Sequence, residues 1–148
     1  MEIDITESGG FWLPSVPLIL APYAQLHPGE VLWVTANGSL RGTAEENGQF
    51  VVPRPVVMRA LLVRTIGEDA QPDDGDLLIT VRKNGENTAL WGAISRGSDP
   101  GHTYMERSAE VYFAQGDLCS IKVENLAGAD SVIVGSISID LGIDHRLQ

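Results

Sequence analysis

The stretch LLITVRKNGENTALWGAIS, residues 77–95, decides the fold. Its first half, residues 77–83, places apolar side chains on alternate positions, which is the period of a half-buried β-strand. Asn84-Gly85 interrupts the alternation, and this pair tolerates the positive φ that a type I′ turn needs at both central positions. The alternation resumes over residues 87–95. The stretch therefore predicts an antiparallel β-hairpin.

The same period of two recurs along most of the chain, and no stretch shows the sustained 3.6-residue period of an amphipathic helix. Asn37-Gly38 and Asn47-Gly48 predict further tight turns between short apolar runs. Short strands with frequent turns are typical of an all-β fold, here an antiparallel jelly-roll β-sandwich of about 8 strands. We expect strands near residues 30–36, 39–43, 49–52, 56–66, 76–83, 87–95, 104–114, 118–125 and 131–141.

Residues 1–29 break this pattern and predict an extended, Pro-rich, apolar N-terminal arm ahead of a jelly-roll domain over residues 30–148. Proline fixes φ and drives its predecessor towards extended geometry. Two interpretations are open for so apolar a segment: it docks on a partner, or it folds back over its own sandwich as an edge strand. Docking is the preferred one, because exposed apolar surface usually marks an interaction site. The partner-binding residues we expect in the arm are Phe11, Trp12, Leu13, Pro14, Leu18, Ile19 and Tyr23.

Charge and composition exclude several classes of partner. The chain has 10 Lys and Arg against 20 Asp and Glu, a formal net charge of −10, whereas binding a phosphate backbone needs a basic face. Residues 11–24, the longest apolar stretch, contain three prolines and are too short to span a bilayer. Cys119 is the only cysteine, and its alternation with apolar neighbours predicts a core position. We expect no nucleic-acid partner, no membrane partner and no intrachain disulfide.

The sequence carries no catalytic signature: no phosphate loop, dinucleotide fingerprint, HExxH, CxxC or GxSxG motif. Its three histidines, His27, His102 and His145, are scattered over the arm, a loop and the tail, so we interpret them as solvated or locally bonded. The acidic cluster of residues 69–76 predicts a turn, with a calcium site as the weaker alternative, because it lacks the spacing of an EF-hand loop. We therefore expect no enzyme activity, no metal and no cofactor.

Aromatic residues on the predicted strands raise the possibility of sugar binding. Trp33 and Trp91 lie between small or apolar residues on predicted strands, so we expect both to be buried in the core or an interface. Tyr112 shares its face with Glu110 and is expected to be exposed. Exposed aromatic rings on a sandwich stack on sugars, and a carbohydrate-binding role is kept open on that ground.

Four segments carry a resemblance to a known family: LITVRKNG (78–85), VYFAQGD (111–117), CSIKVEN (119–125) and ISIDL (137–141). Through these four segments, residues 53–141 resemble the jelly-roll modules of tailed-phage virion proteins. Such modules occur in capsid decoration (cement) proteins and in tail or fibre head domains, commonly as homotrimers.

The resemblance implies a non-enzymatic, homotrimeric decoration protein on the outer capsid surface of a virion. It would stabilise a phage head by bridging subunits of the major capsid protein, with the arm as the segment that clasps the shell or a neighbouring subunit. A tail-tip receptor binder would be expected to carry a fibre shaft or an attachment domain, whereas a decoration protein needs only a compact body and a segment that clasps its partner. We therefore prefer the decoration role. The alternative that the resemblance leaves is a carbohydrate- or receptor-binding head module of a phage tail or fibre.

Overall fold

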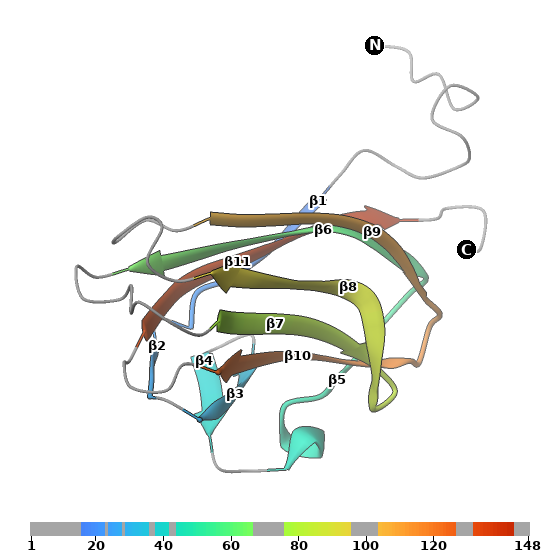
Figure 1. The fold of residues 1–148 in the computed structure, drawn as a ribbon. Helices are drawn as coiled ribbons and strands as arrows, with labels where there is room; N and C mark the ends of the chain where they lie inside the picture. Colours follow the sequence, from blue (N-terminus) through green and yellow to red (C-terminus); the bar gives the residue numbers. More distant parts are fainter. Residues whose placement is uncertain are drawn as a thin grey trace.

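Two antiparallel sheets pack face to face in the computed structural model of the chain (Figure 1). The structure describes residues 16–22, 24–27, 29–35, 38–41, 44–66, 76–95, 104–126 and 132–143. Over these ranges the regular structure consists of strands and one short 3₁₀ helix.

The first sheet brings the two ends of the described chain together. β1 (Val16–Leu20) and β2 (Ala24–Leu26) lie end to end along β11 (Val132–Ile143). On its other side β11 pairs with β6 (Val56–Ile66), and β6 pairs with β9 (Tyr104–Phe113). β1 and β9 are thus the edges of this sheet.

The second sheet is organised around β10 (Leu118–Asn125). One side of β10 pairs with β3 (Val31–Thr35) and β5 (Phe50–Val51), and the other with β7 (Asp76–Lys83). The edges are β4 (Gly38–Arg41), beside β3, and β8 (Glu86–Ser95), beside β7. The 3₁₀ helix η1 (Glu45–Asn47) lies between β4 and β5.

The order of the strands is that of a jelly roll. When β1 with β2, and β3 with β5, are each counted as one interrupted strand and the short edge strand β4 is left aside, the first sheet runs first, eighth, third, sixth along the chain. The second sheet runs second, seventh, fourth, fifth. Two interleaved sheets of this kind define the jelly-roll sandwich, and the predicted fold class is confirmed.

The core lies between the sheets and is built from the alternate side chains that the sequence predicts. Leu77, Ile79 and Val81 are fully buried, as are Ile121 and Cys119 on the neighbouring strand. Each large aliphatic side chain removed from water contributes roughly 1.5–3 kcal/mol to folding. Burial also raises the pKa of the Cys119 thiol to about 12, so this cysteine acts as a small apolar core residue, as predicted.

The hairpin at Asn84-Gly85 is confirmed. Both residues have positive φ, 51° and 82°, and β7 and β8 pair up to the turn. The Asn84 side chain also fastens the hairpin to the turn before β10: its Oδ1 accepts from Leu118 N at 2.8 Å and its Nδ2 donates to Asp117 Oδ1 at 3.1 Å.

The structure differs from the expected boundary between arm and domain. Residues 16–20 and 24–26, assigned from the sequence to the arm, are paired strands of the first sheet, so the sandwich includes Val16 and does not begin near Glu30. Prolines in residues 16–22 obscured the strand pattern, yet an edge strand tolerates proline because one of its sides has no ladder to break. Residues 1–15 lie outside the described residues.

We expect Gly85→Val to destabilise the fold, because a β-branched residue strongly resists the left-handed region that the turn imposes. A loss of about 1–3 kcal/mol in the free energy of unfolding corresponds to a fall in Tm of roughly 2–10 °C for a chain of this size. Ala93→Val is the matched control: Ala93 is exposed in β8, where valine is favourable. Calorimetry at fixed protein concentration gives both values, and an unchanged Tm for Gly85→Val would contradict the turn.

Candidate functional site

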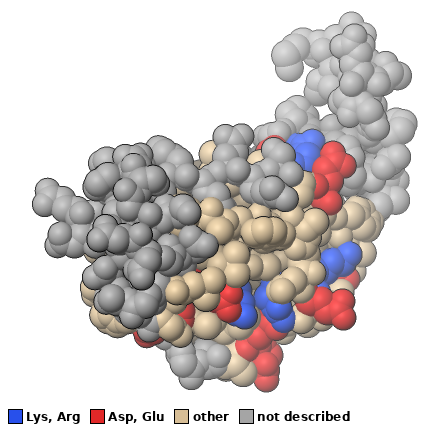
Figure 2. All heavy atoms as spheres, viewed as in Figure 1, with Lys and Arg blue, Asp and Glu red and all other residues tan. Residues whose placement is uncertain are grey.

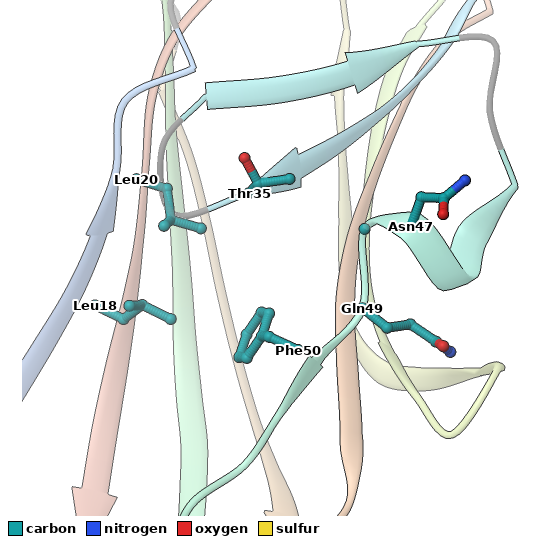
Figure 3. Close-up of a pocket in the computed structure, with 7 residues that line it drawn as sticks. Leu18, Leu20, Thr35, Asn47, Gln49 and Phe50 are labelled. Atoms are coloured by element: carbon teal, nitrogen blue, oxygen red, sulfur yellow. The ribbon is translucent and has the colours of Figure 1, made fainter.

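An apolar cavity of about 380 Å³ opens beside the edge strand β1, at the border between the two sheets. In Figure 3, Leu18 and Leu20 of β1 and Phe50 of β5 point into the same space, while the Asn47 and Gln49 side chains lie on the far side and point away from it. The volume is within the range of roughly 300–1,000 Å³ that is usual for ligand pockets. The cavity lining is Leu18, Leu20, Thr35, Asn47, Gly48, Gln49 and Phe50.

The wall formed by β1 follows from the alternation of side chains along a strand. Leu20 is buried, and Leu18 packs half-buried against the core. Ile19, between them, points the other way and is 63% exposed, more than any other large apolar side chain among the described residues. One edge strand thus offers an inward apolar wall and an outward apolar residue at the same place.

The opposite wall requires a glycine. A Cβ atom on Gly48 would lie 2.6 Å from the Cβ of Trp33, which is a steric clash, so the segment around η1 packs closely on Trp33 only because residue 48 has no side chain. Trp33 is 7% exposed and confirms the expected burial. The predicted type I′ turn at Asn47-Gly48 is wrong: Asn47 ends the 3₁₀ helix, and Gly48 has a φ of −101°.

A polar cluster holds this wall in place from the outer side of the second sheet. The Arg82 guanidinium donates from Nε and Nη2 to the Glu45 carboxylate, the latter bond measuring 3.0 Å. The Ser120 hydroxyl donates to Glu45 Oε2 at 2.7 Å. The hydrogen bond from Arg82 lowers the pKa of the Glu45 carboxyl below its ordinary value, against the opposing effect of burial. The ion pair therefore anchors η1 to β7 and β10.

The predicted partner-binding residues divide into two groups. Leu18 and Ile19 lie on β1, where one faces the cavity and the other is exposed. Phe11, Trp12, Leu13, Pro14 and Tyr23 lie outside the described residues. Leu20 and Phe50, which also line the cavity, are not among the residues predicted from the sequence. The alternation of Leu18 and Leu20 was an available signal for the cavity wall, whereas nothing in the sequence indicates the close approach of Gly48 to Trp33.

A second, shallower hollow of about 310 Å³ lies on the outer face of β7 and β8 and is lined by Leu78, Thr80, Asn87, Thr88 and Trp91. Trp91 is 43% exposed, so it does not lie in the core; burial in an interface stays a prediction. Its neighbours Leu90 and Gly92 face the core instead. Tyr112 is 42% exposed, as predicted.

The remaining expectations about chemistry concern residues that are mostly not described. His102, His145 and the acidic residues 69–75 lie outside the described residues, and His27 donates its backbone N–H to Glu30 Oε1 at 2.6 Å. No group of three His, Cys, Asp or Glu residues suited to a metal ion occurs among the described residues. In the same part of the chain, no helix has the length and hydropathy to cross a membrane.

Comparison with known proteins gives similarities of fold only. No family model matches the chain, and no curated protein matches it. A family 35 carbohydrate-binding module from Clostridium thermocellum is 13% identical, with a TM-score of 0.44 over 84% of this chain and 97% of the module. The empty virus-like particle of cowpea mosaic virus has a chain that is 16% identical, with a TM-score of 0.42 over 91% of this chain and 81% of its own. Similar solved structures thus include a viral capsid protein and a carbohydrate-binding module.

Glu45→Gln should lower the free energy of unfolding at pH 7 by about 1.5–3 kcal/mol, the usual contribution of a hydrogen bond to a charged group. Because the pKa of Glu45 is lower in the folded protein than its ordinary value of 4.5, the stabilisation is complete above about pH 4.5 and is lost as the pH falls through the folded pKa.

The measurement is the difference in Tm between wild type and Glu45→Gln from pH 7 to pH 3. We expect a constant difference near pH 7 that shrinks below about pH 4.5. Glu46→Gln, at the exposed neighbouring position, serves as the control and should leave Tm nearly unchanged. A difference between wild type and Glu45→Gln that does not vary with pH would refute the role of the ion pair.

Proposed function

We propose that this chain is a non-enzymatic capsid decoration protein of a phage, which forms a homotrimer on the outer surface of the shell and bridges subunits of the major capsid protein. The observation that carries the proposal is the apolar cavity beside the exposed edge strand β1. The segment immediately before β1 contains Phe11, Trp12, Leu13 and Pro14, and residues 8–29 have no Asp, Glu, Lys or Arg. An uncharged segment that continues into a strand lining an apolar cavity fits docking on another protein.

Docking at this place would stabilise a shell by burying apolar surface. A decoration protein that bridges two capsid subunits makes their separation expose that surface again, at a cost of about 25 cal/mol per Å². Aromatic side chains bury roughly 150–250 Å² each, so Phe11 and Trp12 would contribute most of the apolar area that the segment buries. This mechanism uses binding alone and needs no catalytic group or cofactor.

The charge of the molecule favours the outside of a shell over its DNA-filled interior. The formal net charge of −10 is repelled by the phosphate backbone. In Figure 2, basic side chains on the face viewed lie mostly beside acidic ones rather than forming a basic surface. Among the described residues, Arg82 forms an ion pair with Glu45, and Lys122 forms one with Glu124. The arrangement supports a body that faces solvent.

A second candidate, a carbohydrate- or receptor-binding head module of a phage tail or fibre, is favoured by the hollow at Trp91. Its half-exposed indole ring lies beside Asn87, Thr80 and Thr88. The middle of β7 and β8 carries no charged side chain, and Figure 2 shows an uncharged area over this part of the molecule. An aromatic ring among amide and hydroxyl groups is suited to stacking on a sugar ring.

One paired experiment separates the two candidates. Wild type, Trp12→Asp and Trp91→Ala are each sedimented with shells of the phage that encodes this chain, and each is applied to a glycan array. The decoration function predicts that wild type and Trp91→Ala sediment with the shells, that Trp12→Asp stays in the supernatant, and that gold-labelled antibody marks the outside of intact particles.

Wild-type protein that does not sediment with the shells would refute the decoration function. Glycan binding that Trp91→Ala abolishes and Trp12→Asp retains would establish the second candidate instead.

A further inference from the structure

The cavity beside β1 has the properties of a receiving site for a large apolar side chain. Leu18, Leu20 and Phe50 converge on it from two strands of different sheets (Figure 3). Its two walls are fixed independently, one by the pairing of β1 with β11 and the other by the ion pair that anchors η1. A cavity with pre-formed walls binds a side chain at a lower entropic cost than a surface that must first be ordered.

The chain itself contains an occupant of matching chemistry. Phe11, Trp12 and Leu13 are consecutive apolar residues without a charged neighbour, and they precede the first residue of β1 by three to five positions. An extended chain spans at most about 17 Å over five residues, so the link to Val16 allows residues 11–13 to reach a molecule that adjoins this edge.

The edge of β1 is poorly suited to the addition of another strand. Pro17 lies in β1, and a proline in an edge strand directs its missing N–H away from the partner strand. A strand that paired with the free edge would find no donor at that position, and proline at edges commonly serves to prevent such pairing. Docking at this place is therefore expected through side chains that enter the cavity.

The segment is also poorly suited to entering the cavity of its own molecule by a tight hairpin. To run back along β1, the chain would have to reverse at Pro14-Ser15. Two-residue hairpin turns need positive φ at their first central position, whereas proline fixes φ near −65°. The reversal that would bring Trp12 or Leu13 back to Leu18 thus conflicts with Pro14.

We propose that the cavity beside β1 receives residues 11–13 of a second copy of this chain, so that neighbouring subunits exchange their N-terminal segments. The inference rests on the proposed homotrimer and names the partner of its apolar segment. Each copy both offers a segment and receives one. Such a head-to-tail contact closes into a ring when the rotation between copies allows it, and three copies give the proposed trimer.

Inter-subunit disulfides test the exchange directly. Leu13→Cys combined with Thr35→Cys places one thiol in the segment and one in the cavity lining. After mild oxidation without any capsid present, we expect covalent dimers and trimers on a non-reducing gel. Cys119 does not interfere, because it is fully buried.

Leu13→Cys combined with Glu110→Cys is the control, since Glu110 is exposed on β9, in the first sheet, and is not part of the cavity lining. The control should give no more cross-linking than Leu13→Cys alone. Only monomeric bands from the Leu13→Cys/Thr35→Cys protein, whether unlinked or linked within one chain, would overturn the exchange.

A matched pair of substitutions on β1 tests the cavity without engineered thiols. Leu18→Trp fills the cavity from within, whereas Ile19→Trp adds the same bulk on the outward side of the same strand. By light scattering, we expect the mass of Leu18→Trp to fall from three times 15.9 kDa to a single chain, and that of Ile19→Trp to stay threefold. Circular dichroism checks that both variants keep their strand content. Equal masses for the two variants would overturn the inference.

Cross-linking and shell binding test the exchange of segments and the decoration function separately. Cross-linked trimers that do not bind phage shells would leave the exchange intact and refute the decoration function. Shell binding by wild type together with no inter-subunit cross-link would refute the exchange and leave the decoration function intact.

Discussion

The antiparallel pairing of the first strands with the last one is the interaction on which the rest of the structure depends. β1 and β2 cover the outer side of β11, which otherwise would be an open edge of the first sheet. Leu20, Ala24 and Leu26 also place their side chains in the core. The same pairing fixes Leu18 as one wall of the cavity. Without it, the sandwich would lose a strand, a row of core contacts and its candidate docking site together.

A single buried amide links this pairing to the other sheet. Asn125, at the end of β10, is fully buried and donates from Nδ2 to the backbone oxygen of Leu26 at 2.9 Å. Its backbone oxygen accepts from Gly29 N at 2.8 Å, and its backbone N–H donates to Glu30 O at 3.1 Å. A buried polar group is costly unless it is bonded, so these contacts hold the chain on a defined path from β2 to β3.

The features that the sequence predicts well are local ones. The hairpin of β7 and β8 follows from a two-residue turn and an alternation that reaches it from both sides, and its φ values agree with the prediction. The position of Cys119 in the core likewise follows from the residues next to it. Such features depend on neighbours in the chain, which a sequence displays directly.

The features that the sequence does not reveal depend on contacts between distant segments. Val16 pairs with Leu141, a partner more than a hundred positions away, and prolines hide the strand character of the segment. Trp91 alternates with small residues on β8, but the set that faces the core is Leu90, Gly92 and Ile94, so the aromatic ring is exposed. A shift of one residue exchanges the faces of a strand, and periodicity alone does not choose between two apolar faces.

The two candidate functions lie at different places on one fold. The cavity at β1 exists because two sheets meet beside an edge strand, and it suits docking of apolar side chains. The hollow at Trp91 lies on the outer face of β7 and β8, at the opposite edge of the second sheet, where a half-exposed aromatic ring lines it. A jelly roll accommodates either role because its function depends on sites that the scaffold carries rather than on the scaffold.

Native-state hydrogen exchange of the peptide that covers residues 16–26 tests the pairing of the first and last strands most directly. Paired β1 and β2 predict amide protection in this peptide close to that of β11, since both sides of one ladder open together. Exchange at the rate of an unstructured chain, with β11 still protected, would show that the segment is a free arm and would contradict the structure described for the edge of the sandwich.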